Sequence, residues 1–259
     1  MLRPRFRGAP GAALTVYEIL AGKKKRPFAV LRRRLLRWSA AVLALVVLTS
    51  ILQVLLLRWV PPLFTVPMVY SWVGRPFGEG SRPPIRYRWI PLTAVSDHLQ
   101  RAVLAAEDQR FFDHHGFDLV EIRHALTEAA GGDRLRGAST ISMQTARSVF
   151  LVPSRSIWRK GLEAYYTVLI EALWGKRRIL EMYLNTVDWG DGIFGAEAAA
   201  RAYYKASAAD LNRSRAALMA AILPNPHRYS PLRPTAFVRQ RQQRILADLP
   251  HMPLVHEID

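Results

Sequence analysis

The sequence predicts a mainly α-helical protein in which one membrane-spanning helix near the N-terminus precedes a helical domain. Three observations support this prediction. One long segment is apolar throughout, apolar residues then recur at helical spacing along most of the chain, and the sequence shows neither strand-like alternation nor an internal repeat. Half of the 259 residues are hydrophobic, which is enough for a packed core, and the chain has no cysteine. The lack of cysteine excludes a disulfide framework, a cysteine nucleophile and a thiolate metal site.

Positive charge is concentrated at the N-terminus. The chain carries 37 basic and 20 acidic residues, a formal net charge of +17, but residues 1–37 hold eleven of the basic residues and one acid, Glu18. The remainder has 26 basic and 19 acidic residues, a net charge of about +7. An evenly basic chain would indicate nucleic-acid binding, whereas basic residues gathered beside an apolar segment indicate membrane topology. We therefore expect no nucleic-acid partner and assign residues 1–37 to a basic cytoplasmic tail.

The apolar segment covers residues 38–59, WSAAVLALVVLTSILQVLLLRW, and has no charged residue between Ser39 and Leu57. A helix of this length, rising about 1.5 Å per residue, spans the roughly 30 Å hydrocarbon core of a bilayer. A buried core helix is the alternative, but a helix that is apolar on every face is hard to bury in a small domain. A cleaved signal peptide usually has a shorter apolar region. Because the basic residues precede this transmembrane helix, we expect a cytoplasmic N-terminus and the chain after Trp59 on the other side of the membrane.

Residues 60–91 are rich in proline, glycine and aromatic residues, and they predict a linker or membrane-proximal segment without a long helix. Helices dominate from Ser96, which we expect to act as an N-cap. Periodic apolar residues predict the later helices, about eight to ten in the whole chain. The predicted ranges are 117–130, 139–149, 157–174, 176–185, 195–204, 214–223 and 235–249. The helical domain is assigned to residues 92–250 and a C-terminal tail to residues 251–259.

Glu107 is the first candidate for chemistry. It interrupts an apolar run in the stretch RAVLAAEDQRFFDHHGFD, residues 101–118, and is expected at the edge of an apolar helix face. Partial desolvation there would raise the pKa of the carboxyl group and make it a better proton acceptor near neutral pH. The alternative is a surface ion pair, for instance with Arg110. The histidines that follow lack a metal-binding spacing such as H-E-x-x-H, so a histidine that stabilises the turn is the favoured interpretation.

Two further stretches combine helix starts with basic residues. RLRGASTISMQTARSVF, residues 134–150, places hydroxyl and free backbone N–H groups where an anion could bind, although an ordinary N-cap has the same pattern. SRSIWRKGLEAYY, residues 154–166, crowds three basic residues just before Glu163. A phosphate-binding cluster and an i, i+4 ion pair are both consistent with this spacing. The sequence contains neither a Walker loop nor a G-x-S-x-G nucleophile elbow.

In order and spacing, these stretches resemble the peptidoglycan glycosyltransferase family in its monofunctional biosynthetic form. The second family motif, G-[AG]-S-T-I-x-Q-Q, corresponds to GASTISMQ, and the fourth, K-x-x-I-L-E-x-Y-L-N, corresponds to KRRILEMYLN. The first, E-D-x-x-F-x-x-H-x-G, and the third, R-K-x-x-E, correspond to Glu107, Asp108, Phe111, His114 and Gly116, and to Arg159, Lys160 and Glu163. Two positions depart from the pattern, because Met143 replaces the usual first glutamine of motif two and Arg147 replaces a usual lysine.

The resemblance implies a lysozyme-like helical catalytic domain with a small membrane-proximal lobe. It implies that the protein polymerises lipid II into linear glycan strands by an inverting transfer that releases polyprenyl diphosphate. Glu107 matches the family's general base and Glu163 its second essential glutamate. The residues implied on the substrate and diphosphate side are Ser139, Thr140, Gln144, Arg147, Arg155, Arg159 and Lys160. The residues implied to shape the site are Asp108, Phe111, His114, Gly116, Glu181 and Asn185.

The resemblance also implies partners and a location. The expected partners are lipid II, the growing lipid-linked glycan chain, the membrane and other cell-wall synthesis proteins. A divalent cation, Mg²⁺ or Mn²⁺, would suit the diphosphate, although the sequence shows no dedicated metal cage. The expected location is the inner (plasma) membrane, with one span and a periplasmic catalytic domain. Only about thirty residues follow the LPNPHRYSP turn, so we expect no transpeptidase activity.

Three other functions are compatible with parts of the pattern. A membrane-anchored lytic hydrolase would need an acid near the leaving oxygen, and the basic cluster argues against it. A scaffold with a decayed site is supported by Met143 but opposed by the presence of both glutamates. A DNA-binding membrane protein is disfavoured because the charge lies before the span.

Overall fold

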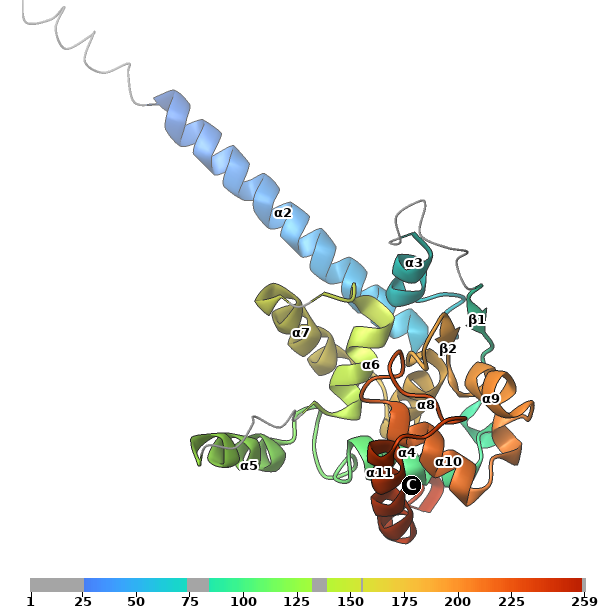
Figure 1. Cartoon of the computed structure of the whole chain (residues 1–259). Coiled ribbons are helices and arrows are strands. Elements are labelled where there is room, and N and C mark those ends of the chain that lie inside the picture. The colour runs from blue at the N-terminus through green and yellow to red at the C-terminus, as the bar shows by residue number, and fades with distance from the viewer. Residues whose placement is uncertain (1–25, 74–83, 132–138, 155, 258–259) are drawn as a thin grey trace, which may run out of the picture. The chain divides into compact units, whose positions relative to one another are not determined.

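The computed structural model describes residues 26–73, 84–131, 139–154 and 156–257, and within these ranges it is mainly helical, as the sequence predicts (Figure 1). The chain divides into two units, residues 1–53 and residues 54–259. The first unit consists, in its described part, of one helix. The second unit contains the remaining helices and two short strands.

The first unit holds most of the helix α2, Arg26–Leu57. This helix starts earlier than the predicted range 38–59, because leucine and arginine favour helix and the only proline, Pro27, lies in the first turn, where it is tolerated. Its apolar side chains, such as Leu43 and Leu48, are exposed. By length and composition, residues 31–57 could cross a membrane. Residues 1–25 of the predicted basic tail lie outside the described residues.

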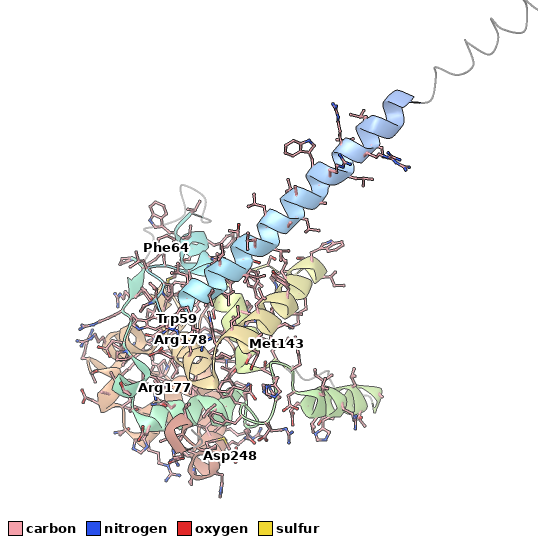
Figure 2. All side chains as sticks on the ribbon, turned by 180° about the vertical axis from the view of Figure 1, so that it is seen from behind. Trp59, Phe64, Met143, Arg177, Arg178 and Asp248 are labelled. Carbon is pink, nitrogen blue, oxygen red and sulfur yellow. The ribbon has the colours of Figure 1, made fainter. Side chains whose placement is uncertain are left out.

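The last turn of α2 belongs to the second unit, where two side chains donate to its carbonyl groups. Trp174 Nε1 donates to the Val54 carbonyl at 2.8 Å. Arg178, which Figure 2 labels, donates to the Leu57 carbonyl through Nε and Nη2 at 3.1 and 2.8 Å. Arg58 Nη1 in turn donates to the Leu173 carbonyl at 2.8 Å. These bonds satisfy carbonyl groups that helix ends leave without a partner within the helix.

The second unit is built from helices that pack in pairs. The helix α10 packs against both α4 and α11, and α6 packs against both α7 and α8. The described α-helices of this unit are α3 (Val66–Val73), α4 (Asp97–Glu107), α5 (Leu119–Ala130), α6 (Ile141–Phe150), α7 (Ile157–Leu173), α8 (Lys176–Thr186), α9 (Ala196–Tyr204), α10 (Arg213–Ile222) and α11 (Ala236–Asp248). Short 3₁₀ helices occupy Leu92–Ala94, Ala208–Asp210, Leu249–His251 and Val255–Glu257.

The helices α4, α8 and α10 contribute much of the core. Nearly all of α8 from Ile179 onward is buried, and α10, with the sequence RSRAALMAAI, buries four alanines together with Met219 and Ile222. Small side chains let α10 approach its neighbours closely, which is why a short helix can serve as the centre of the unit. The strands β1 (Arg86–Tyr87) and β2 (Ile193–Phe194) pair in parallel, Arg86 opposite Ile193, and join the segment 84–92 to the body.

The helix starts follow from hydroxyl and amide side chains in the sequence. Ser96 caps α4 by accepting a hydrogen bond from the Leu99 amide at 3.2 Å, as predicted. The same arrangement starts the helices α6, α7, α10 and α11, whose N-caps are Thr140, Ser156, Asn212 and Thr235. These caps fix where each helix begins, and therefore which residues reach the site described below.

Candidate active site

Glu107 is the last residue of α4, and two side chains from other helices donate to its carboxylate. Gln144 Nε2, from α6, lies 3.0 Å from Oε2, and Arg241 Nη2, from α11, lies 2.9 Å from Oε1. The Glu107 side chain is only 12 % exposed. Arg110, which the sequence offered as an alternative partner, instead donates to Asp118 at 3.0 Å. The carboxylate is therefore held from both sides at the rim of the core.

The surroundings of Glu107 change its acidity. Burial raises the pKa of the Glu107 carboxyl above its ordinary value, as its position at the rim predicts. The hydrogen bond from Gln144 and the positive charges of Arg241 and Arg147 lower the pKa again, but only in part. A carboxylate with a raised pKa is a stronger proton acceptor, which suits a general base near neutral pH.

The orientation of Gln144 is fixed by Tyr183. The hydroxyl of Tyr183, on α8, donates to Gln144 Oε1 at 3.3 Å, so the amide nitrogen must point to Glu107. Tyr183 is fully buried, and burial together with the nearby Glu107 charge raises the pKa of its phenol well above the usual range. It therefore stays a hydrogen-bond donor. Arg147 lies one turn after Gln144 on α6, and its side chain is exposed.

The turn after Glu107 is tied to the start of α6. Asp108 Oδ2 accepts from the backbone amide of Ile141 at 2.8 Å, and Asp108 also accepts from His114 Nε2 at 3.1 Å. The Gly116 amide donates to His114 Nδ1 at 3.2 Å, and the Thr140 hydroxyl donates to the Gly116 carbonyl at 2.6 Å. These bonds connect the first two motifs into one framework.

Gly116 and Phe111 complete this framework. Gly116 has φ +92° and lies against α7, where an added Cβ would be 2.7 Å from a methyl carbon of Thr167. Only glycine adopts this backbone conformation without strain and leaves room for α7. Phe111 is fully buried, and the ammonium group of Lys176 lies 4.6 Å from its ring centroid.

A second charged cluster lies on α7. The Glu163 side chain is 1 % exposed and pairs with both Arg159 and Lys160. The Lys160 side chain is about half exposed, whereas the acid it pairs with is buried. The cluster therefore presents positive charge at the protein surface. Tyr166 stacks on Phe150 with 4.3 Å between ring centroids, which fixes α7 on α6.

The other residues predicted on the substrate side differ in how available they are. The Thr140 hydroxyl is buried, and both of its hydrogen bonds are made within the protein. It donates to the Gly116 carbonyl and accepts from the Met143 amide at 3.2 Å. Ser139 is partly exposed, and its carbonyl lies 3.5 Å from Gln144 Nε2. Arg155 lies outside the described residues. The structure thus brings Gln144 and Arg147 to Glu107 and leaves Arg159, Lys160 and Glu163 as a cluster on the adjoining helix.

The fourth motif holds the segment that precedes α4. Asn185 accepts from the Ile90 amide and donates to the Ile90 carbonyl, both at 2.9 Å. Glu181 Oε1 accepts from the Leu92 amide at 2.9 Å, and Glu181 Oε2 pairs with Arg178. In these contacts both side chains bind backbone groups of the segment before α4.

Sequence reasoning missed Arg241 and Tyr183 as neighbours of the candidate base. Tyr183 stands in the fourth motif, at the consensus tyrosine, so its position in that motif was a signal. Arg241 lies in a basic helix with several arginines, and no spacing there indicates which of them faces Glu107. Its role follows only from the packing of α11 on α4.

The described acidic and histidine side chains bear on the predicted divalent cation. Within the described ranges, no group of three or more histidine, cysteine, aspartate or glutamate side chains could hold a metal ion. Glu163, the acid nearest to the basic cluster, is already paired with two cations. Mg²⁺ at a diphosphate is commonly held by one or two carboxylates together with the substrate phosphates, so the predicted divalent cation stays a prediction.

Comparison with known proteins agrees with this geometry. The profile of the transglycosylase family matches residues 76–250, a range that contains all four motifs. The chain belongs to the transglycosylase family. Biosynthetic peptidoglycan transglycosylases from Rhodospirillum centenum and Stutzerimonas stutzeri are 52 % and 49 % identical to it, each over 212 residues. Those alignments cover 82 % of this chain and 89 % and 87 % of the relatives.

A relative with lower identity matches over a similar length. A biosynthetic peptidoglycan transglycosylase from Bacteroides thetaiotaomicron is 42 % identical over 214 residues, which is 83 % of this chain and 86 % of the relative. The predicted family is thus confirmed, and with it the mainly helical, lysozyme-like class of the transglycosylase domain. The protein is a glycosyltransferase of peptidoglycan synthesis with one helix that could anchor it in a membrane.

Proposed function

We propose that this transglycosylase polymerises lipid II, with Glu107 as the general base. The C4 hydroxyl of the acceptor sugar gives its proton to the Glu107 carboxylate, and its oxygen forms a bond to the anomeric carbon of the donor. The bond between that carbon and the diphosphate oxygen breaks, and polyprenyl diphosphate leaves with the electron pair. Attack opposite to the leaving group makes the transfer inverting.

The donor side needs positive charge rather than an acid. Glycosidases protonate a poor leaving group, but a diphosphate is already stable as an anion, so cations that neutralise it are sufficient. Arg147, beside Glu107, and Arg159 and Lys160, on α7, are the described candidates. The buried Glu163 carboxylate forms ion pairs with both Arg159 and Lys160 and so holds them in place. A divalent cation at the diphosphate, as the family resemblance implies, stays a prediction, and the proposed mechanism has no step through it.

The membrane location of a lipid-linked substrate agrees with an enzyme anchored by α2. A lipid-linked sugar stays at the membrane surface, and an enzyme held there by α2 meets it without diffusing through the aqueous phase. Arginines 32–34 and 37 precede the apolar part of the helix, and by the positive-inside rule they place the N-terminus in the cytoplasm. We therefore propose a single-pass protein of the inner membrane with a periplasmic catalytic domain. Other cell-wall synthesis proteins stay predicted partners.

One observation supports the role of Glu107 most directly. Its carboxylate lies almost buried between the donors Gln144 and Arg241, and burial raises its pKa. The test is polymerisation of lipid II by purified Glu107→Gln protein in detergent. General-base catalysis contributes about 10² to 10⁴-fold, so a loss of that size is expected with lipid II binding retained.

The matched control is Glu128→Gln, the same change at an exposed glutamate of α5. It should leave the polymerisation rate unchanged. If Glu107→Gln kept most of the wild-type rate, the base would have to be another group. If wild-type protein did not polymerise lipid II at all, the substrate would be wrong.

A further inference from the structure

Two stacked aromatic rings lie where the loop between α10 and α11 meets the first turn of α11. The ring centroids of Tyr229 and Phe237 are 5.3 Å apart, and the ring planes differ by 27°. Tyr229 is half-buried and packs against the core, whereas Phe237 is 49 % exposed. The pair therefore presents one ring to the solvent on a second ring that is fixed to the body of the unit.

This exposed ring stands out in its part of the chain. Among the described residues after Val168, the large hydrophobic residues that are exposed are Leu232 and Phe237. A single exposed hydrophobic side chain needs no explanation. An exposed ring that is supported by a second ring and lies close to a reactive carboxylate does need one.

The position of Phe237 on α11 places it close to Glu107. Phe237 lies one helical turn before Arg241, which donates to Glu107 Oε1 at 2.9 Å, and residues four apart on a helix are about 5–6 Å apart on one face. Asp248, about three turns after Phe237, lies on the same edge of α11 and accepts from Gln109 in the turn after Glu107 at 3.1 Å. The helices α11 and α4 lie side by side (Figure 1), and this edge of α11 faces the end of α4.

We propose that Phe237, supported by Tyr229, binds the acceptor sugar by stacking against the apolar face of its pyranose ring. The proposal rests on the proposed function of Glu107 as the base that takes the proton of the acceptor hydroxyl. It assigns a substrate contact to the C-terminal helix, which carries none of the four motifs.

The chemistry of the two rings suits a sugar. A pyranose carries its hydroxyl groups around the rim and C–H groups on its faces, so an aromatic ring can cover a face while the rim stays hydrated. The guanidinium of Arg228 lies 5.7 Å from the ring centroid of Tyr229. It adds positive charge beside the rings, which suits a substrate whose peptide carries carboxylates.

The contacts of Glu107 favour the acceptor over the donor. Its two oxygens face different helices, because Oε2 accepts from Gln144 on α6 and Oε1 accepts from Arg241 on α11. The helix α6 packs against α7, which carries two of the cations proposed for the leaving diphosphate. The α11 side is therefore left for the sugar that gives up its proton. One helical turn, about 5.4 Å, is close to the width of a sugar ring, so a sugar whose hydroxyl reaches Glu107 can cover Phe237.

The rings are held in place before any substrate arrives. The loop 224–235 contains four prolines, which restrict its backbone. Within it, the amides of Arg228 and Tyr229 both donate to the Asn225 carbonyl, at 3.1 and 3.0 Å. A ring that is already ordered loses little conformational entropy when a ligand covers it.

The test is a single transfer between separate donor and acceptor substrates, catalysed by the full-length chain in detergent. Lipid II that is methylated at the C4 hydroxyl of its terminal sugar can donate but cannot accept. An analogue with CH₂ in place of the anomeric oxygen can accept but cannot donate, because its carbon–carbon bond does not release the diphosphate. Each pair reacts once, so the KM of each substrate is measured separately.

Phe237→Ala should raise the KM of the acceptor about three- to tenfold, the value of one aromatic contact. The KM of the donor and kcat should change by less than about twofold, because the ring touches neither the diphosphate nor the base. In ordinary polymerisation, where lipid II is the acceptor at each step, the KM for lipid II should rise by the same factor.

Three variants separate stacking from a purely structural contact that only fixes the loop on α11. Phe237→Tyr keeps the ring and should equal wild type. Phe237→Leu keeps apolar bulk without a flat ring, so the KM of the acceptor should rise as in Phe237→Ala. The matched control is Leu232→Ala, which truncates the other exposed apolar residue of the loop and should leave both KM values unchanged.

An acceptor KM within about twofold of wild type in Phe237→Leu and Phe237→Ala would overturn the proposal. If Phe237→Ala does not fold, Phe237→Leu alone decides. A rise in the donor KM alone, an equal rise in Leu232→Ala, or a defect confined to lipid vesicles would overturn it too, and the last would indicate a membrane contact. Failure of the proposed function looks different, because wild type would then not polymerise lipid II, or Glu107→Gln would keep its activity, whatever the Phe237 variants do.

Discussion

Asp108→Asn tests how the turn after Glu107 holds the start of α6. The Gly116 amide donates to His114 Nδ1, so that nitrogen carries no hydrogen and Nε2 must be the donor. Asp108 therefore faces two donors, His114 Nε2 at 3.1 Å and the Ile141 amide at 2.8 Å. Asparagine has one oxygen for these two donors, and whichever way its amide turns, its NH₂ group faces an N–H.

The expected cost follows from these contacts. The site is buried, so the hydrogen bonds to a charged acceptor are lost or weakened and the NH₂ group is left opposite an N–H donor. Together these changes destabilise the second unit by about 3 kcal/mol. For a unit of this size that corresponds to a fall in melting temperature of about 6–12 °C.

The assay is thermal unfolding of full-length protein in detergent, followed by circular dichroism. Asp113→Asn is the matched control, because Asp113 lies in the same turn but is exposed, and it should change stability by less than about 0.5 kcal/mol. In a double-mutant cycle with His114→Ala, which removes one of the two donors, the cost of Asp108→Asn should fall by about 1–2 kcal/mol. Melting of Asp108→Asn within about 2 °C of wild type would refute the assignment of the His114 proton.

Three further outcomes follow from the site. Glu163→Gln should still bind lipid II but turn it over at least about tenfold more slowly, because Arg159 and Lys160 lose the carboxylate that holds them in place. Full activity of this variant would show that Glu163 is only an ion-pair partner. Met143→Gln should change the polymerisation rate by less than about twofold, because Gln144 already donates to the base, and a large gain would show that position 143 has a polar role. Gly116→Ala should destabilise the protein by about 3 kcal/mol in thermal melts, because its Cβ would collide with α7 at positive φ. Gly161→Ala, in open space on α7, should instead be neutral or stabilise by up to about 1 kcal/mol, and equal melting of these two glycine variants would contradict this argument.

The sequence predicted most of the helices because their signals are local. Ser96 and Thr140 stand directly before periodic apolar residues, and each caps its helix within one or two residues of the expected start. The span was predicted for the same reason, although α2 begins earlier than residue 38, since no residue in the basic stretch ends a helix. Helix capping and side-chain periodicity depend on residues that are close in the sequence, so they can be predicted without knowledge of the tertiary structure.

The site was predicted only as far as its motifs are continuous. Glu107 and Gln144 were both identified, but their direct contact, through which Gln144 acts on the base, depends on how α6 meets α4. Arg241 was missed because it comes from a distant helix whose periodicity specifies a buried face and not a particular arginine. Which side chains of two separate helices meet depends on how the helices pack. A single sequence gives little information on that packing.

The alanines of α10 have a further consequence for the chemistry. This helix touches both α4, which ends in Glu107, and α11, which carries Arg241. It therefore acts as a spacer, and the bulk of its side chains sets how near the guanidinium comes to the carboxylate. One extra methyl group on a buried face of α10 would push the two neighbouring helices apart and lengthen that contact, so residues remote from any sugar could tune how readily the enzyme accepts a proton.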